Sequence, residues 1–275
     1  MYKNKERLAL VFCLIWISLI FSAFKGFHFW YAGFLVFFWL SLGFLNYRHE
    51  TSLWLLRNRT TLFLKFVIVS AVVGFIADYL IGIKISHFWN YPFYNDLFDW
   101  VRLYLIIYPF GGLSILELVF FLSGLSGDKL YFIHKTNNLT QKFIDASDHF
   151  VDIFLLIVIL LWPLMYWFGV KLPIRHFFAY GFLVWLVIAT VKFAYHIKHG
   201  WHWVAIFLAA LLMSLLLNEY PNTVALEWVY YNGPILNYKI LELPVWVMLG
   251  WYVMILFMMR LWIRLVWAKK PHIIH

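Results

Sequence analysis

The sequence is poor in charge: Asp, Glu, Lys and Arg together make up 13% of the 275 residues, whereas 64% are apolar. Soluble domains carry about 25% charged and 45–50% apolar residues, so this chain has too little polar surface to face water on all sides. It also has a single cysteine, Cys13, which lies within an apolar stretch. One cysteine excludes an intramolecular disulfide framework and a thiolate metal site. The sequence further lacks a CxxC pair, a glycine-rich phosphate loop and a Ser-His-Asp arrangement, so the commonest soluble chemistries find no motif here.

Long apolar runs take the place of the missing polar surface. A membrane-spanning helix needs about 20 predominantly apolar residues. Aromatic residues reach 23% and include 16 Trp, which suits the interfacial belts of a bilayer protein. The sequence therefore predicts an all-α polytopic membrane protein with about eight transmembrane helices. The predicted spans are 8–24, 27–46, 62–83, 101–123, 150–170, 176–195, 202–217 and 243–263.

The most polar region lies in the middle of the chain and divides the spans equally. We expect an N-terminal four-helix half at 1–123, a polar cytoplasmic linker at 124–149 and a C-terminal four-helix half at 150–275. Such an arrangement predicts two parallel repeats about an axis along the membrane normal.

The net charge of +9 reflects the membrane topology of the chain and does not indicate a nucleic-acid partner. Lys and Arg collect in cytoplasmic loops. With a cytoplasmic N-terminus, all but six of the 22 basic residues fall on the inner side, which predicts that both termini are cytoplasmic. The loops 84–100 and 218–242 then share the outer side. The six outer residues are Lys25, Lys84, Arg102, Lys171, Arg175 and Lys239.

Two acids, Asp78 and Glu117, lie within otherwise membrane-grade sequence. An ionisable side chain at that depth costs about 2.5–3.5 kcal/mol on insertion scales and usually faces a polar cavity or a partner. A similar pattern of acid, Trp-x-Tyr and proline occurs in both halves, which supports the repeat. The first copy is Asp78, Trp89-Asn90-Tyr91 and Pro109, and the second is Glu219, Trp228-Val229-Tyr230 and Pro244.

These motifs resemble those of the membrane lycopene cyclases of carotenoid biosynthesis. Asp78, Gly82, Trp89 and Tyr91 match the first part of a cyclase module, and Glu117, followed shortly by Phe120-Phe121, is similar to the second part. The chain departs from the family at Ser114, where proline is usual, and at Leu116, where a first glutamate is usual. The resemblance implies an isomerase of a bacterial or archaeal plasma membrane. It implies Glu117 and Asp78 as catalytic acids and Trp89, Tyr91, Trp228, Tyr230 and Glu227 as substrate contacts.

The chemistry of these residue types is consistent with such an activity. Protonating an alkene requires an acid in an apolar site, and the resulting carbocation is stabilised by aromatic faces. We therefore expect the lipid bilayer and an apolar isoprenoid or lipid ligand as partners. The sequence assigns no cofactor, no metal and no oligomeric state. Alternatively, Asp78 and Glu117 hydrogen-bond neighbouring helices and the aromatic residues mark the interface.

Two other functions remain open from sequence. A non-catalytic lipid-binding or transport protein would share the same composition. A divergent membrane prenyltransferase would use acids such as Asp96 and Asp99 to hold Mg²⁺. The nearest second acid cluster, at Asp145, Asp148 and Asp152, falls on the inner side, opposite Asp96, and is typical of a helix cap.

Overall fold

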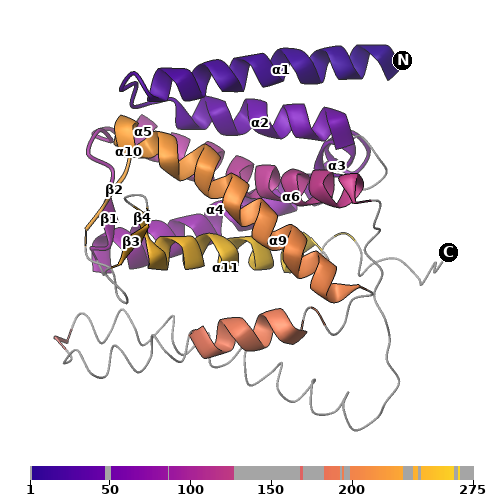
Figure 1. Ribbon diagram of the computed structural model, residues 1–275. Coiled ribbons are helices and arrows are strands. Elements are labelled where there is room, and N and C mark those ends of the chain that lie inside the picture. The colour runs from indigo at the N-terminus through magenta and orange to yellow at the C-terminus, as the bar shows by residue number, and fades with distance from the viewer. Residues whose placement is uncertain are drawn as a thin grey trace, which may run out of the picture.

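The structure, a computed structural model, is predominantly helical over the residues that it describes (Figure 1). The described residues are 2–46, 51–85, 87–126, 168–169, 183–192, 194, 199–231, 238–240, 243–262 and 266. Most of the predicted linker, the predicted span at 150–170 and the acid cluster at 145–152 lie outside them, as does much of the predicted span at 176–195.

The N-terminal part forms two hairpins of helices and a short strand. An antiparallel pair, α1 and α2, is followed by a short helix, α3, which lies at the N-terminal end of α1 (Figure 1). The elements are α1 Tyr2–Ala23, α2 Tyr31–Asn46, α3 Ser52–Asn58, α4 Thr60–Gly74, the π-helix η1 Phe75–Ile85, β1 Trp89–Asn90, α5 Leu97–Arg102, the π-helix η2 Leu103–Ile107 and α6 Tyr108–Leu125.

The C-terminal part packs onto the same bundle. In Figure 1, α9 crosses diagonally in front of α6, and α11 lies beneath it. The elements are α9 Gly200–Ser214, the π-helix η3 Leu215–Glu219, α10 Tyr220–Ala225, β2 Val229–Tyr230, β3 Lys239–Ile240, β4 Leu243–Pro244 and α11 Val245–Trp262, with a further apolar helix at Leu183–Lys192.

Four of the described helices are long and apolar enough to cross a membrane: Asn4–Ala23, Thr60–Lys84, Leu97–Leu125 and Gly200–Ala225. They correspond to four of the predicted spans. Two more predicted spans coincide with the shorter apolar helices Tyr31–Asn46 and Val245–Met259. The described residues thus show several apolar helices of membrane-spanning character, and the full set of eight spans is not confirmed.

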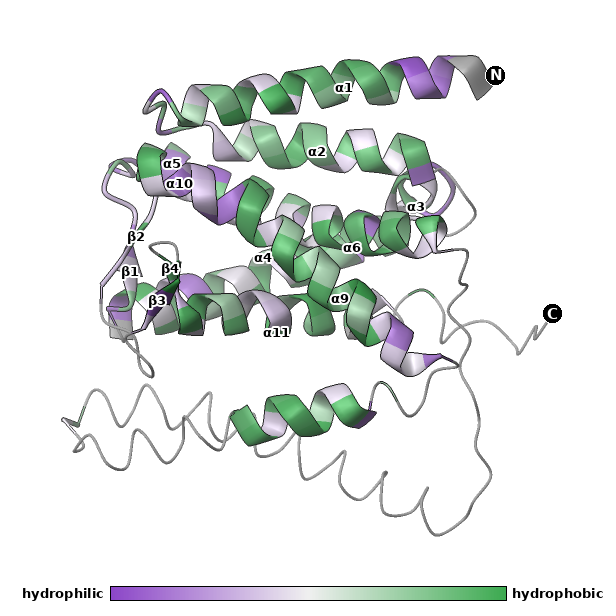
Figure 2. Ribbon diagram, viewed as in Figure 1, coloured by the Kyte–Doolittle hydropathy of each residue, from purple (hydrophilic) through white to green (hydrophobic). Residues whose placement is uncertain are grey.

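The outward surface of these helices is apolar, and polar residues gather at the helix ends and loops (Figure 2). Soluble proteins rarely expose large contiguous apolar surfaces, because water penalises them. A bilayer would cover such a belt. Its exposed members include Leu10, Leu14 and Phe21 on α1, Ile68 on α4, Leu105 on η2 and Leu212 on α9.

The helix α6 occupies the centre of the bundle and contacts α2, α4, α9 and α11. Small residues let neighbouring helices approach it closely, which is how helices pack when lipid removes the hydrophobic driving force between them. Gly74 on α4 is one such position. A Cβ there would lie 2.4 Å from the Tyr108 ring, so only glycine admits that ring.

The described part of the chain includes three π-helical segments, η1, η2 and η3, and a proline follows two of them. Pro109 follows η2 by two residues and Pro221 follows η3 by two residues. A proline has no N–H to donate, and its ring clashes with the carbonyl four residues earlier, at Leu105 or Leu217. The widened π turn accommodates that clash within a continuous helix. Such turns occur often at functional sites.

The two Trp-x-Tyr segments meet in a small antiparallel sheet. Trp89 pairs with Tyr230 and Asn90 pairs with Val229. The pairing confirms that the loops 84–100 and 218–242 lie at the same end of the bundle. It also joins the N-terminal and C-terminal parts of the chain directly (Figure 1).

Candidate functional site

Asp78 is the centre of the first of two acid–aromatic units. It lies in η1, is 1% exposed and accepts three hydrogen bonds from aromatic side chains. The indole N–H of Trp89 donates to Oδ1 at 2.6 Å, the hydroxyl of Tyr91 donates to Oδ1 at 2.9 Å, and the hydroxyl of Tyr104 donates to Oδ2 at 2.8 Å. All three donors are neutral. The structure therefore brings together Asp78, Trp89 and Tyr91, as the sequence motif predicts, and adds Tyr104 from η2.

Gly82 explains how the Trp89 indole reaches Asp78. Gly82 lies one helical turn after Asp78, and a Cβ at that position would lie 2.1 Å from the Trp89 ring. The ring also stacks on Trp246, with centroids 5.9 Å apart. A glycine is therefore required at position 82 for the indole N–H to meet the carboxyl group.

Glu219 is the centre of the second unit and repeats the arrangement of the first. It lies in η3 and is 1% exposed. Trp251 donates its indole N–H to Oε1 at 2.7 Å, Tyr230 donates its hydroxyl to Oε1 at 2.8 Å, and Trp228 donates its indole N–H to Oε2 at 3.2 Å. The Trp228 N–H also lies 2.9 Å from the Tyr230 hydroxyl.

The two units are equivalent in chemistry and in the elements that build them. Each acid lies in a π-helical turn, receives a Trp and a Tyr from the Trp-x-Tyr segment that follows it, and receives one more aromatic donor from the next helix. The pairing of β1 with β2 places the units side by side, and the Trp89 and Tyr230 rings meet edge to face at 6.4 Å. Trp246 lies against both rings, 5.9 Å from Trp89 and 5.5 Å from Tyr230.

Glu117 lies apart from both units, in the contact between α6, α2 and α3. It is fully buried. Its Oε1 accepts the backbone N–H of Ser52 at 2.8 Å and the Ser52 hydroxyl at 2.5 Å, and its Oε2 accepts the side-chain amide of Asn46 at 2.8 Å. Because Ser52 is the first residue of α3, the carboxyl group accepts a backbone N–H that has no partner within that helix. This geometry matches a helix-capping role for Glu117.

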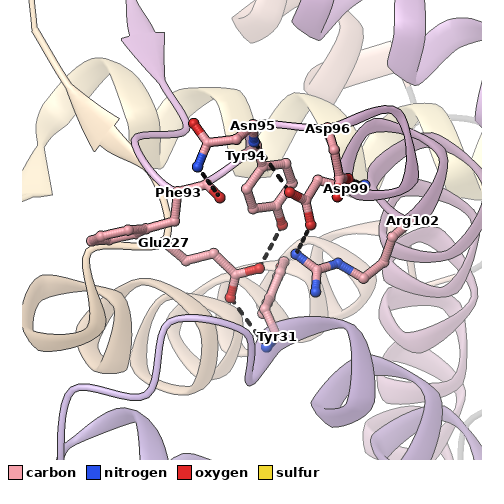
Figure 3. A network of polar contacts seen from close by, with 8 residues as sticks. All are labelled: Tyr31, Phe93, Tyr94, Asn95, Asp96, Asp99, Arg102 and Glu227. Carbon is pink, nitrogen blue, oxygen red and sulfur yellow. Dashed lines mark hydrogen bonds and ion pairs between the residues drawn. The ribbon is translucent and has the colours of Figure 1, made fainter.

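Glu227 belongs to a third polar cluster, at the end of the bundle that carries the strands (Figure 3). Its Oε1 accepts the Tyr94 hydroxyl at 2.5 Å and its Oε2 accepts the backbone N–H of Tyr31 at 3.2 Å. Arg102 lies with its guanidinium 5.0 Å from the centre of the Tyr94 ring and pairs with Asp99 at 3.4 Å. The cluster ties the loop before α2, the loop before α5 and the segment after α10 together.

The protonation of Glu227 reflects this environment. Burial raises the pKa of the Glu227 carboxyl to about 7, because an apolar surrounding disfavours the charged form. The Tyr94 hydroxyl, the Tyr31 N–H and the Arg102 charge oppose the shift, and Asp99 adds to it. Burial and the neighbouring Glu227 likewise raise the pKa of Tyr94 well above its usual value, so that phenol stays protonated and donates.

The acids considered for a prenyltransferase, Asp96 and Asp99, lie at the start of α5 and cap that helix. The Oδ1 atom of Asp96 accepts the backbone N–H of Asp99 at 2.9 Å, and Oδ2 of Asp99 accepts the backbone N–H of Asn95 at 3.1 Å. This reciprocal pattern satisfies donors at the start of α5. Over the part of the chain that the structure describes, no group of three potential metal-ligating side chains lies together.

Sequence reasoning missed two aromatic members of the two units. Tyr104 and Trp251 follow their Trp-x-Tyr segments by more than ten residues and lie in apolar helices, where an aromatic residue gives no signal of its own. Glu219 appears in the sequence repeat, but the structure makes it a full counterpart of Asp78. A Tyr-Pro pair follows η2 and η3 directly, as Tyr108-Pro109 and Tyr220-Pro221, and is the sequence signal for these two π-helical segments.

Comparison with known proteins adds no relative: no protein-family model, curated protein or solved structure matches the chain.

Proposed function

We propose that the chain is an integral membrane protein in which Asp78 and Glu219 form a paired acid–aromatic site for an apolar isoprenoid, with a reaction of the lycopene-cyclase type. The observation that carries the proposal is the pairing of β1 with β2, which sets two equivalent units side by side. Each unit combines a buried carboxyl group with indole and phenol rings. The exposed apolar belt and the four long apolar helices support the membrane location.

The proposed reaction uses both components of a unit. A protonated carboxyl group gives its proton to one carbon of an alkene, and the alkene's π electrons form the new C–H bond. The other carbon of that alkene becomes a cation. A second alkene of the same molecule attacks this cation and closes a ring, and loss of a proton to the carboxylate restores the acid. The faces of Trp89, Trp228 and Trp246 supply the electron density that stabilises the cation. The overall change is an isomerisation and needs no oxidant or reductant.

Expression of the full chain in a lycopene-accumulating bacterium tests this function. We expect cyclised carotenoids in the pigment extract, and loss of product by at least about 100-fold in Asp78→Asn and in Glu219→Gln, because general acid catalysis contributes about 10²–10⁴-fold. Glu117→Gln is the matched control. It replaces an equally buried acid whose oxygens contact Ser52 and Asn46, so we expect it to retain product.

The outcomes separate the alternatives. An unchanged pigment profile with correctly inserted wild-type protein would contradict the cyclase reaction and leave a non-catalytic lipid-binding role. Loss of product in Glu117→Gln, with membrane levels equal to wild type, would instead make Glu117 the catalytic acid that the sequence motif predicts.

We further propose that both termini are cytoplasmic and that the strands lie on the outer side. The distribution of Lys and Arg supports this orientation. A reporter fused after His275 should be cytoplasmic, whereas reporters inserted near Asn95 and Asn232 should both be external. Insertion sites on opposite sides of the membrane would contradict the orientation.

A further inference from the structure

A groove opens at the end of the bundle opposite the paired strands, where α1, α2 and α3 meet. It has a volume of about 410 Å³, within the range of small-molecule sites. The groove is lined by Asn4, Lys5 and Leu8 from α1, Phe44 from α2, and Leu53, Leu56 and Arg57 from α3. In Figure 1 this is the region around the N-terminus of α1 and the label of α3.

The lining residues divide into apolar walls and a basic rim. Leu53, Leu56 and Arg57 are three and four residues apart on α3 and therefore share one face of that helix. Lys5 and Leu8 are likewise three residues apart on α1. α1 and α3 thus each present one cation beside an apolar side chain.

This pattern matches a lipid with an anionic headgroup. Leu8 and Leu56 are 42% and 37% exposed, so the apolar wall is open to an acyl chain. Two cations within reach of one headgroup attract an anionic lipid more strongly than a zwitterionic one.

We propose that this groove binds one anionic phospholipid, with its phosphate between Lys5 and Arg57 and an acyl chain along Leu8, Phe44 and Leu56. The inference relies on the proposed membrane location but not on the proposed reaction. Bound lipid would bridge α1 to α3. Because α3 also supplies Ser52 to Glu117, the lipid would brace the inner end of α6.

Titration of the purified full chain with dioleoyl phosphatidylglycerol or dioleoyl phosphatidylcholine in mixed micelles tests the site. Melting temperature and native mass spectrometry of retained lipid are the readouts. We expect phosphatidylglycerol to be retained preferentially and to raise the melting temperature more. The double variant Lys5→Gln/Arg57→Gln should weaken its retention by roughly thirtyfold, since each of the two basic residues near the surface contributes about 1 kcal/mol.

Two further variants keep the test specific. Arg59→Gln/Lys65→Gln removes the same charge from exposed residues that do not line the groove, and it should retain phosphatidylglycerol like wild type. The conservative pair Lys5→Arg/Arg57→Lys should also retain it. Equal loss in the two Gln double variants, or equal retention of the two lipids, would overturn the proposal.

Inorganic phosphate and glycerol phosphate distinguish a lipid site from a site for a free anion. We expect neither to raise the melting temperature at concentrations that match the lipid. Full stabilisation by either would overturn the lipid assignment. The pigment assay reports on the acid–aromatic site alone, so a failure there is distinguishable from a failure here.

Discussion

Replacing Asp78 by leucine is expected to lower the free energy of unfolding by at least about 3 kcal/mol, because a buried donor without an acceptor costs about 1–3 kcal/mol. The substitution removes the carboxylate oxygens that accept from Trp89, Tyr91 and Tyr104. The leucine side chain fills similar space but accepts nothing. Unfolding of the purified chain in mixed micelles, followed by tryptophan fluorescence against SDS fraction, measures the difference.

Asp78→Asn is the matched control for that measurement. The amide keeps the shape of the side chain and one acceptor oxygen, so we expect a distinctly smaller loss than for leucine. Glu219→Leu and Glu219→Gln should reproduce the same order, since Glu219 accepts from three aromatic donors as well. Leucine variants as stable as wild type would show that the aromatic donors do not depend on the acids.

Stability should also fall as the pH rises from 5 to 8, and Glu227 should cause the fall. Burial raises its pKa from 4.5 to about 7, so the folded chain holds a proton that the unfolded chain has released. The contribution is fully present below pH 4.5 and is lost as the pH rises through 7. At 1.36 kcal/mol per pKa unit, the total amounts to about 3 kcal/mol.

Two variants identify Glu227 as the origin of this pH dependence. Glu227→Gln imitates the protonated carboxyl group, so its melting temperature should vary less between pH 5 and 8 than that of wild type. Tyr94→Phe removes a hydrogen bond that lowers the pKa of Glu227, so the loss of stability should move to higher pH. A pH profile of Glu227→Gln that matches wild type would assign the effect to another group.

The sequence predicts the acid–aromatic units well where their members are close along the chain. Asp78, Trp89 and Tyr91 belong to one helix end and the loop that follows it, so short-range motif reasoning groups them. The placement of the two loops at the same end of the bundle follows from the positive-inside pattern. Local signals of this kind survive folding because the chain has little freedom to separate residues so near in sequence.

The sequence fails where a partner comes from a distant helix. Glu117 has mostly apolar neighbours on its own helix, with Ser114 as the nearest polar one, which favours a functional acid, yet Ser52 and Asn46 reach it from α3 and α2. These contacts cannot be predicted from the hydrophobic periodicity of any one helix, because the packing of α2 and α3 on α6 determines them. The number of membrane spans is similarly hard to predict. The helix α2 has 16 residues and is shorter than the length that hydropathy analysis requires of a membrane span.

The pairing of β1 with β2 imposes an order on biosynthesis. Trp89 leaves the ribosome long before Tyr230, and at 5–20 residues per second the interval is on the order of ten seconds. Asp78 has its three aromatic donors within the first 104 residues, so the first unit can assemble while the rest of the chain is still being translated. Its strand edge meanwhile remains open, and an open edge is a template for pairing with other chains. The edge of β1 closes only when β2 arrives and pairs with it.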